Sequence, residues 1–486
     1  MGEEQQRIKK LSEIKKKGIE PYPAKSKRSY TCYQVEKEFN KIGKTKKIVL
    51  LGRLVLIRLH GKACFAHIQD GTGRFQLFLN QKDLGEEEYK FFVKNIDVGD
   101  FIQAEGKLFT TKRGEKTLQV HSWKILSKAI LPLPEKWHGL ADIETRFRQR
   151  YLDLLVNKKV KDIFIKRSQI IKVIRKFFDD LEYVEVDTPI LQPLAGGAAA
   201  KPFVTHHQAL DIDLYLRIAP ELYLKRLIVA GFERVYEISR CFRNEGIDWA
   251  HNPEFTQIEF YQAYADYQDL MKLTENLLQR LVKEVTGKLT IEYQGKKINF
   301  KPPYPKMDYK EALLNHTGID IDKEKDIKLL AKKAEKLKIP VDKTWGRGKI
   351  IDEIYNETVR PKIINPTFLI NHPIELSPLS KQIPDRPGYV ERFQLLVAGL
   401  EVCNAFSELN DPLEQEKRFK EQQKLLDKGN QEAHPFDQDF ITALKHGMPP
   451  TAGEGIGIDR LVCILTNTRN IKEVILFPTL RPKQEE

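Results

Sequence analysis

Apolar positions near the start of the chain recur with helical spacing. Ile8, Leu11 and Ile14 stand three residues apart within residues 3–17, a stretch that also holds six Lys or Arg residues. This spacing predicts a helix with one apolar side and one basic side. Solvation alone and contact with RNA explain the basic side equally well. We therefore describe residues 1–45 as an N-terminal basic helical segment and leave its role open.

Within residues 46–128 the pattern changes to that of short β-strands. The five candidate strands are IVLLGRLVLIRL, ACFAHIQD, RFQLFLN, DFIQAEGKLFT and KTLQVHSWKIL. Five short strands with glycine-containing turns predict a small barrel of the OB type, a fold that binds oligonucleotides through aromatic stacking and a few polar groups. Phe65 and Gln76 are candidates for these two roles. The hydrophobic pattern alone favours a core position for Phe65.

Residues 129–140 separate this barrel from the rest of the chain. They contain ILPLPEKWHG, whose prolines and closing glycine are typical of a semi-rigid linker. Helical patterns follow at 142–156, 159–181 and 266–286, with strand-like runs between the last two. A further helical stretch at about 308–360 reads as an insertion. The chain is thus expected to be an α+β protein whose larger domain spans 141–486.

Composition narrows the classes of function. The formal net charge of +13, from 81 basic and 68 acidic residues, favours a polyanionic partner without separating RNA binding from solubility. The five cysteines are scattered and form no CxxC pair, which argues against a disulfide framework and a thiolate zinc site. No run of 18 apolar residues occurs, and Glu3 and Glu4 stand where a leader would be basic. We expect a cytoplasmic protein without a membrane partner.

Two β-like runs, RVYEISRCFR and PEFTQIEFYQAYA, flank the polar loop NEGIDWAHN and predict a hairpin. The two-residue period places Phe255, Glu259 and Tyr261 on one face. Arg243 at the strand end can grip phosphate or carboxylate, and Phe255 can stack on a purine, while His251 in the loop can approach a phosphate. A charged surface hairpin without a ligand remains an equal alternative at this point.

Three further segments carry candidate chemistry. In GLEVCNAFSELND, the residues Asn404, Phe406 and Glu408 alternate onto one face, and Glu401 can join them only through a β-bulge. In GEGIGIDR, alternating glycines before Arg460 leave room for a flat ligand. GGAAAKPF and RIAPELYLKRL supply a small-residue loop and a helix with Glu221 in its first turn. Ordinary strand burial and helix capping are the competing explanations.

Together these segments resemble the class II aminoacyl-tRNA synthetases, and among them the lysine-specific branch. The extended run ending at Pro189 resembles motif 1, FRNEG with HNPEF resembles motif 2, and GIGIDR resembles motif 3. GGAAAKPF, APELYLKRL and NAFSELNDP resemble the lysine-specific enzymes rather than their aspartate- or asparagine-specific relatives. The resemblance covers nearly the whole chain. It implies a catalytic domain on a mixed, mainly antiparallel sheet, a homodimer, and ATP, L-lysine, lysine tRNA and Mg²⁺ as ligands.

The resemblance also implies roles for individual residues. Arg243 and Arg460 would be catalytic, with Arg243 holding the α-phosphate and the lysine carboxylate. The residues implied for ATP are Arg243, Glu245, His251, Asn252, Phe255, Glu401 and Arg460. Those implied for lysine are Gly197 and Glu221 at the α-amino group, Glu259 and Glu408 at the ε-ammonium, and Tyr261, Asn404 and Phe406 around them. Phe65 and Gln76 correspond in position to residues that read the anticodon.

The charges agree with this assignment, because a desolvated ammonium needs carboxylate partners that would repel an aspartate substrate. Gln394 departs from the family, which usually has a second acidic metal ligand there, so Glu401 would be the main protein ligand and Mg²⁺ would be held more weakly. Glu182 replaces a common glycine in motif 1, and Glu454 a common apolar residue in motif 3. Ala250 and Ser122 put one phosphate contact and one anticodon contact in doubt.

Two alternatives remain. An enzyme that lysylates a protein factor would share the catalytic segments but lack the barrel. A catalytically silent RNA-binding relative is suggested by Gln394 alone, against intact Arg243, Glu259 and Arg460. A class I synthetase is disfavoured, because the chain has no HIGH-like, KMSKS-like or GxxxxGK[ST] segment.

Overall fold

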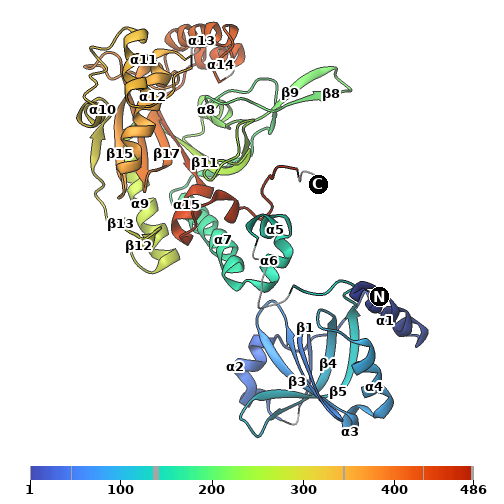
Figure 1. Cartoon of the computed structure of the whole chain (residues 1–486). Helices are drawn as coiled ribbons and strands as arrows, with labels where there is room; N and C mark the ends of the chain where they lie inside the picture. The colour runs from blue at the N-terminus through green and yellow to red at the C-terminus, as the bar shows by residue number, and fades with distance from the viewer. Residues whose placement is uncertain (1, 45, 135–141, 343–344, 431, 483–486) are drawn as a thin grey trace. The chain divides into compact units, whose positions relative to one another are not determined.

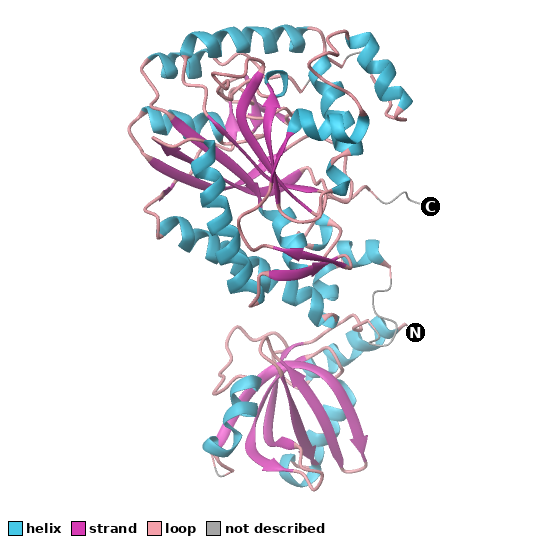
Figure 2. Ribbon diagram, turned by 90° about the vertical axis from the view of Figure 1, so that its left-hand side faces the viewer, coloured by secondary structure: helices cyan, strands magenta, loops and turns pink. Residues whose placement is uncertain are grey.

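The computed structural model describes residues 2–44, 46–134, 142–342, 345–430 and 432–482. The chain divides into two compact units, Met1–Ala141 and Asp142–Glu486 (Figure 1). The first unit is a barrel of strands with short helices, and the second is a sheet flanked by helices (Figure 2). Among the described residues, no helix is long and apolar enough to cross a membrane.

Five strands close into a barrel in the order β1-β2-β3-β5-β4. They are β1 (Lys47–His60), β2 (Ala63–Gln69), β3 (Arg74–Asn80), β4 (Phe101–Thr110) and β5 (Lys116–Ser127). Gly106 stands at a register shift between β4 and β5, where a Cβ would lie 1.8 Å from the carbonyl oxygen of Gln119, so glycine is required. The predicted five-stranded OB-type barrel is confirmed.

The two-residue period decides which side chains fill the barrel. In β2, Cys64, Ala66 and Ile68 are buried in the core, whereas Phe65 is half-buried on the opposite side of the strand. The core position that the sequence pattern favoured for Phe65 is therefore wrong. Its hydrophobicity suggested the core, but its parity relative to its neighbours places it outside.

Two helices precede the barrel and share its core. They are α1 (Glu3–Lys16) and α2 (Cys32–Ile42), and Ile14, Val35 and Phe39 pack with the barrel residues. The predicted amphipathic helix is present. Its basic Arg7 is buried and donates to the backbone oxygens of Val98 (3.1 Å) and Ala129 (3.2 Å). Residues 1–45, which the sequence separated from the barrel, belong to the same compact unit.

The helices α3 (Gln81–Leu84) and α4 (Glu86–Asn95) join β3 to β4. Just beyond β5, the fully buried ammonium of Lys128 pairs with Asp97 at 2.6 Å and with Asp100 at 2.8 Å. These pairs fasten the end of the last strand to the loop before β4. Of the expected linker 129–140, residues 129–134 form no helix or strand, and the rest lies outside the described residues.

An eight-stranded sheet forms the centre of the second unit, in the order β14-β15-β16-β17-β18-β11-β10-β6. Its strands are β6 (Val184–Glu185), β10 (Arg234–Phe242), β11 (Glu254–Ala263), β14 (Lys306–Asp308), β15 (Thr367–Pro373), β16 (Tyr389–Val397), β17 (Leu400–Ser407) and β18 (Thr451–Gly457). All neighbours are antiparallel except the two edge pairs, β14 with β15 and β10 with β6. The expected mixed, mainly antiparallel sheet is confirmed.

Long helices pack on one face of this sheet and enclose the main core. They are α7 (Lys158–Asp179), α9 (Tyr267–Thr286) and α15 (Ile458–Thr466). Two short helices, α5 (Ile143–Arg148) and α6 (Arg150–Val156), precede α7, and a small hairpin of β12 (Thr290–Tyr293) and β13 (Lys296–Asn299) follows α9. Phe178 of α7, Leu277 of α9 and Phe260 of β11 meet in this core. The helices predicted at 142–156, 159–181 and 266–286 are present, the first as two helices.

The same core holds a carboxyl group. Glu454 of β18 is 1% exposed, and burial raises its pKa to about 8. Its Oε2 lies 2.7 Å from the hydroxyl of Thr274, which is also 2.7 Å from the backbone oxygen of Leu270. A hydroxyl has one proton, and the Leu270 oxygen can only accept, so a protonated Glu454 satisfies both contacts by donating to Thr274. Glu454 is therefore a neutral acid at pH 7.

The insertion at 308–360 contains α10 (Tyr309–Thr317), α11 (Ile327–Lys336) and α12 (Arg347–Thr358). These helices pack into a core of their own that includes Leu369 of β15 and Leu396 of β16. The insertion is thus fixed to the sheet rather than appended to it. Short 3₁₀ turns lie at Arg360–Lys362, Ile374–Leu376 and Ile471–Glu473.

The remaining helices are α8 (Glu221–Val229), α13 (Pro412–Asp427) and α14 (Gln438–Lys445), which share a small core that includes Tyr261. A three-stranded sheet of order β7-β9-β8 consists of β7 (Leu191–Gln192), β8 (Val204–His207) and β9 (Ile212–Leu216). The β8–β9 hairpin extends outward from the second unit in Figure 1.

Candidate active site

Neighbouring strands align the sequence-predicted residues in rows. Glu259 of β11 lies opposite Gly455 of β18, which in turn lies opposite Asn404 of β17. In the next row, Tyr261, Gly453 and Phe406 are aligned in the same way. Residues in one row share a face of the sheet. The alternation predicted for the hairpin and for β17 is therefore correct, and the candidate residues of these strands lie on one surface.

The alternating glycines of β18 serve two different purposes. A Cβ on Gly453 would lie 2.3 Å from the Tyr261 ring and 2.4 Å from Glu408 Oε1, so the space above this glycine is already filled by protein. A Cβ on Gly455 would meet its nearest neighbour, Glu259, at an ordinary 3.5 Å. Gly453 is thus needed for packing, whereas Gly455 leaves its side of the sheet open to a ligand.

Glu401 reaches this face through an irregularity in β17. The pairing of β16 with β17 shifts register between Leu395 and Leu396, so that Leu395 faces Cys403 but Leu396 faces Glu401. One extra residue in β17 reverses the parity of Glu401 relative to Asn404. The sequence required such a bulge if Glu401 was to join the site, and the structure contains it.

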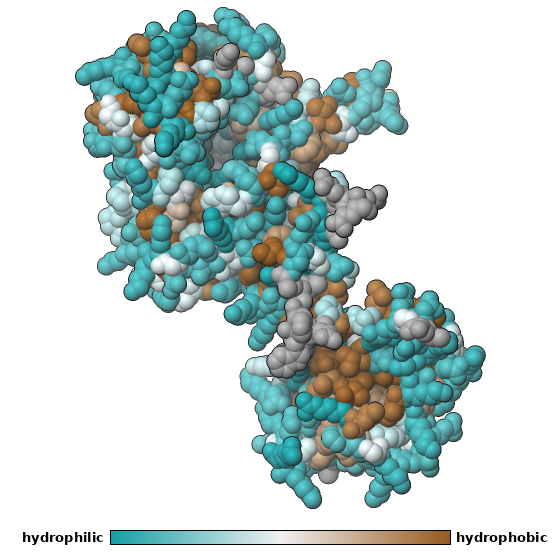
Figure 3. All heavy atoms as spheres, in the orientation of Figure 1, coloured by the Kyte–Doolittle hydropathy of each residue, from teal (hydrophilic) through white to brown (hydrophobic). Residues whose placement is uncertain are grey.

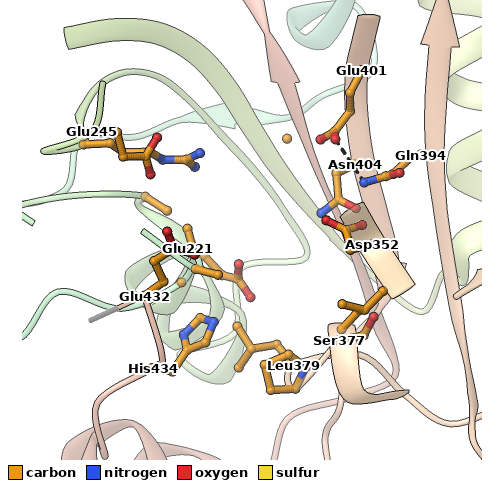
Figure 4. A pocket seen from close by; sticks show the side chains of 18 of the residues that line it. Glu221, Glu245, Asp352, Ser377, Leu379, Gln394, Glu401, Asn404, Glu432 and His434 are labelled. Atoms are coloured by element: carbon orange, nitrogen blue, oxygen red, sulfur yellow. Dashed lines mark hydrogen bonds between the residues drawn. The ribbon is translucent and has the colours of Figure 1, made fainter. Parts of the chain in front are cut away.

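These residues line one large cavity with a volume of 1090 Å³. Figure 4 shows Glu221 and Glu245 on one side of it and Glu401, Gln394, Asn404 and Asp352 on the other. The sequence-predicted residues in its wall are Gly197, Glu221, Arg243, Glu245, His251, Asn252, Phe255, Glu259, Tyr261, Gln394, Glu401, Asn404, Phe406 and Arg460. Glu408 is not in the wall, since it is fully buried behind it.

One part of the cavity has the features of an anion and nucleotide site. The guanidinium of Arg243 lies 5.0 Å from the centre of the Phe255 ring. Arg243 Nε is buried without a hydrogen-bond partner among the described residues, and so is Asn252 Oδ1. Buried polar atoms are normally paired, so these two atoms are available to a ligand or to ordered water.

The loop of the hairpin joins this part to the helix α15. His251 Nδ1 lies 2.8 Å from Asp248 Oδ2, and His251 Nε2 lies 3.3 Å from Arg460 Nη2. Arg460 also donates to the backbone oxygen of Glu401 at 3.0 Å. The two predicted cationic residues, Arg243 and Arg460, therefore line the same cavity, and Arg460 is held in place from two sides.

Asp459, which the sequence patterns did not single out, anchors this arrangement. Its Oδ2 accepts from the backbone N–H of Thr256 at 2.8 Å, and its Oδ1 pairs with Arg167 of α7 at 2.5 Å. The side chain thus ties motif 2 to the helix of motif 3. It precedes Arg460 in the segment GIGIDR, and both of its partners lie far away in the chain.

Another part of the cavity is acidic. Burial, reinforced by repulsion from Glu221, raises the pKa of Glu259 to about 8. Gln257 donates to Glu259 Oε1 at 2.6 Å and the Tyr261 hydroxyl donates to Oε2 at 3.2 Å. Two donors therefore fix the carboxyl while leaving it close to the cavity. An entering cation would favour its ionised form.

Lys225 is a second residue that the sequence analysis missed. Its ammonium lies 2.5 Å from Glu221 Oε1 and also pairs with Glu408 Oε2. Burial opposes the charge, but the two carboxylates outweigh it and raise the pKa of Lys225. Glu221 and Lys225 stand four residues apart on α8, the spacing of an acid–base pair on one helix face, which is the signal that could have found it.

Arg392 of β16 orients Asn404. Its Nε donates to Asn404 Oδ1 at 2.8 Å, while its Nη1 donates to the backbone oxygen of Leu376 at 2.7 Å. Gln394, two residues on, donates through Nε2 to Glu401 Oε2 at 3.0 Å, shown as a dashed line in Figure 4. The described residues contain no group of three or more His, Cys, Asp or Glu side chains arranged to hold a metal ion.

A separate candidate surface lies on the barrel. Phe65 packs against Phe78 with ring centres 4.9 Å apart, and Phe78 against Phe109 at 5.8 Å. Gln76 lies on the same side of β3 as Phe78, but it is 7% exposed and its Nε2 donates to Thr117 Oγ1 at 2.8 Å. Phe65 and Gln76 therefore lie on one face of the barrel. Phe65 belongs to a row of aromatic rings there, and the amide of Gln76 is held by its hydrogen bond.

Two family profiles match the two units of the chain. "OB-fold nucleic acid binding domain" matches residues 48–126, and "tRNA synthetases class II (D, K and N)" matches residues 142–481. The chain belongs to the class II tRNA synthetases. The match to this synthetase family begins at the first residue of the second compact unit, Asp142–Glu486.

This synthetase is also similar to individual curated proteins over nearly its whole length. It is 52% identical to a lysine–tRNA ligase of Carboxydothermus hydrogenoformans, over 98% of this chain and 97% of that protein. It is 49% identical to lysine–tRNA ligases of Pelotomaculum thermopropionicum, over 98% of this chain and 94% of the relative, and of Chloroflexus aurantiacus, over 99% and 98%.

Proposed function

We propose that this synthetase is a lysine–tRNA ligase, which activates L-lysine with ATP and transfers it to lysine tRNA. The observation that carries the proposal is the acidic part of the cavity, where Glu221 and Glu259 line the wall and Glu408 lies behind it. A pocket with three carboxylates favours an amino acid with two ammonium groups and repels an acidic one. The lysine–tRNA ligases to which the chain is similar support the same substrate.

The first step joins the two parts of the cavity. ATP would occupy the part around Arg243, with its base on Phe255 and its phosphates near His251, Asn252 and Arg460, and with Glu245 at the adenine. The lysine carboxylate would then attack the α-phosphorus and release pyrophosphate. Arg243 would neutralise the charge that builds up on the phosphate, so catalysis rests on positioning and electrostatics.

The amino acid would lie across the rows of β11, β18 and β17. Glu221 beside Gly197 would accept the α-ammonium, and the close approach of these two residues supports this, because a Cβ on Gly197 would stand 2.8 Å from Glu221 Cβ. The ε-ammonium would meet Glu259 and the negative field of Glu408. Tyr261, Asn404 and Phe406 would form the walls.

Magnesium fits the site as a partner of the nucleotide. A Mg²⁺ ion at triphosphate needs only one or two carboxylates from the protein. Glu401 supplies one, and Gln394 can offer its amide oxygen only if it turns its N–H₂ away from Glu401. When bound, the ion would neutralise phosphate charge. We propose that this chain holds it mainly through Glu401.

The tRNA anticodon would bind the outer face of the barrel. The aromatic row of Phe65, Phe78 and Phe109 is suited to stacking unpaired bases, and Gln76 could exchange its bond to Thr117 for a base edge. The presence of this barrel disfavours an enzyme that lysylates a protein factor. The intact cavity disfavours a silent RNA-binding relative. Five buried free cysteines support a cytoplasmic location.

We also propose a homodimer formed through motif 1 and the β8–β9 hairpin. Apolar side chains gather over β8 and β9 in Figure 3. The exposed apolar residues of this region are Leu181, Val184, Ile190, Leu191, Leu194, Val204, Leu210 and Ile212. Such a concentration is unusual on a free surface and is typical of a subunit interface. Sedimentation of the full chain would test it, with a monomer as the contradicting result.

The decisive experiment is ATP–pyrophosphate exchange measured with each of the twenty amino acids. We expect exchange with lysine and near-background rates with the others. Aminoacylation of lysine tRNA should follow, and a mixture of acceptor proteins should remain unmodified. Exchange that depends on aspartate or asparagine, or no exchange at all, would overturn the proposal.

A further inference from the structure

The buried ion triplet of Glu221, Lys225 and Glu408 lies beside the proposed lysine site. Lys225 is 1% exposed, Glu221 8% and Glu408 0% at the side chain. The rings of Phe406 and Phe440 stand 5.3 and 5.9 Å from the ammonium. A lysine so enclosed must be paired, because an unpaired buried ammonium would lose its proton. Its charge is therefore a fixed part of the site.

The other ionisable groups around this triplet cancel or stay neutral. Burial and the charge of Lys225 lower the pKa of His434 to about 4, so this ring is neutral at pH 7. Burial raises the pKa of Tyr261 well above its ordinary value, so it is neutral as well. These two groups add no charge to the site.

Two nearby ion clusters also balance internally. Glu237 pairs with Arg217 at 2.5 Å. The positive charge of Arg392 is matched mainly by Glu401, because burial raises the pKa of Asp352 and favours its neutral form. In the proposed function Arg243, which also acts on Glu259, is matched by the substrate carboxylate and the α-phosphate. What remains are three carboxylates, Glu221, Glu259 and Glu408, against the ammonium of Lys225. With all four ionised, the pocket has a formal charge of −2, which equals the two ammonium charges of a lysine molecule.

We propose that Lys225 is a positioning residue that determines specificity. As a permanent counter-ion, it sets the charge of the pocket to match an amino acid with two ammonium groups. It also links the α-amino subsite to Glu408. The proposal rests on the proposed function. Burial raises the pKa of Glu221 and of Glu408, and the adjacent charge of Lys225 opposes that rise in both. Lys225 thereby favours the ionised form of both acceptors for the two ammonium groups of the substrate. An amino acid with a neutral side chain leaves one buried carboxylate uncompensated and is rejected.

Removal of the Lys225 charge has a specific consequence. Three carboxylates and two substrate ammonium groups balance only if one carboxyl keeps a proton in the complex. Lysine binding to such a variant therefore requires a proton that the wild-type complex does not need. Its affinity for lysine falls as the pH rises above the pKa of that carboxyl, by up to roughly tenfold for each pH unit.

The test measures lysine-dependent ATP–pyrophosphate exchange between about pH 6 and pH 8.5, with KM for lysine and kcat determined separately. Lys225→Met should raise KM about tenfold at the acid end and progressively more toward the alkaline end, with a smaller change in kcat. Lys225→Arg keeps the charge and should keep the wild-type profile. The double variant Lys225→Met with Glu408→Gln restores the formal balance and should lose the alkaline rise in KM.

Parallel pH profiles for the wild type and Lys225→Met, or an alkaline rise that persists in the double variant, would overturn the proposal. Thermal unfolding of each variant separates loss of folding from loss of binding. If Lys225→Met does not fold, the arginine and double variants still decide the question by their profiles. A wild-type protein without lysine-dependent exchange would instead refute the proposed function, so the two failures are distinguishable.

Discussion

The two faces of the eight-stranded sheet each carry a buried glutamate, and their similarity is instructive. Burial raises the pKa of Glu259, on the cavity face, and of Glu454, on the core face, to about 8 in both cases. Glu259 sits among other carboxylates and two hydrogen-bond donors beside open space. Glu454 sits against α9 with Thr274 as its neighbour. Equal perturbation therefore does not imply an equal role.

The two carboxyl groups differ in the partners that can reach them. A ligand with an ammonium group can reach Glu259 and favour its ionised form. The charge pair that forms in this buried position then contributes to binding. The carboxyl of Glu454 is 1% exposed and lies against Thr274 on the other face of the sheet, where the core keeps it neutral and hydrogen-bonded. A perturbed acid is a functional candidate only where it borders space that a partner of opposite charge can enter.

The largest expected effect comes from Glu259→Gln. The amide keeps the shape and removes the charge, so kcat/KM for lysine in pyrophosphate exchange should fall by roughly 100-fold or more, the usual loss for one side of a buried charge pair. Glu454→Gln is the matched control on the other face, and it should retain most of the activity. Equal losses in both variants would show that the distinction between the faces is wrong.

The second comparison concerns stability against pH. Glu454 binds its proton more tightly in the folded chain, with a pKa of about 8, than in the unfolded chain, where its ordinary value applies. Between these two pKa values, the folded state holds a proton that the unfolded state has lost. The stability that this proton contributes is present at low pH, falls as the pH rises from the ordinary pKa of a glutamate toward 8, and is lost above pH 8. Glu454→Gln should be more stable than the wild type at pH 9 by a few kcal/mol and similar at pH 5.

Thermal or urea unfolding at both pH values measures this difference. Other groups also titrate over this range, so the quantity of interest is the change between the variant and the wild type. A difference that stays constant from pH 5 to pH 9 would contradict a neutral Glu454.

The glycines of β18 offer a third comparison, within the cavity face itself. Gly453→Ala places a methyl group 2.3 Å from the Tyr261 ring, and overpacking of this kind costs about 1–3 kcal/mol. We expect kcat/KM for lysine to fall by roughly tenfold to 100-fold. Gly455→Ala meets only an ordinary contact at 3.5 Å and serves as the control for stability. The two variants should unfold at clearly different temperatures, with Gly453→Ala the less stable.

The smallest expected effect belongs to Gln394→Glu. It adds a carboxylate beside Glu401, so the Mg²⁺ concentration that gives half-maximal exchange should fall by several-fold in the presence of ATP. In the absence of Mg²⁺, repulsion between the two carboxylates should lower stability slightly. A magnesium titration that matches the wild type would show that Gln394 does not limit metal binding.

The rows of the site follow from the sequence because strand parity is a local property. Glu259, Tyr261, Asn404 and Phe406 could be placed on one surface, and the need for a bulge at Glu401 was visible. The barrel was equally clear. These features depend on residues that are close together in the chain or on motifs with fixed spacing.

Other features depend on partners that sequence cannot supply. Phe65 was assigned to the core because hydrophobicity outweighed parity. Lys225 was overlooked because Glu221 beside Pro220 has a sufficient local explanation in helix capping, and its second partner, Glu408, lies far along the chain. Glu182 was singled out in the sequence as a departure from the resembled motif 1. Only the structure shows its φ of 59°, the left-handed conformation that a glycine would adopt without strain.

The irregularity in β17 has a consequence for the length of the chain. Because one additional residue between Leu400 and Asn404 turns Glu401 toward the cavity, that strand cannot lose a residue without turning this side chain away. A change of amino acid there alters one contact, but a deletion of one codon would remove the acidic group from the cavity while every other motif stayed intact. In this stretch, the number of residues is under stronger constraint than their identity.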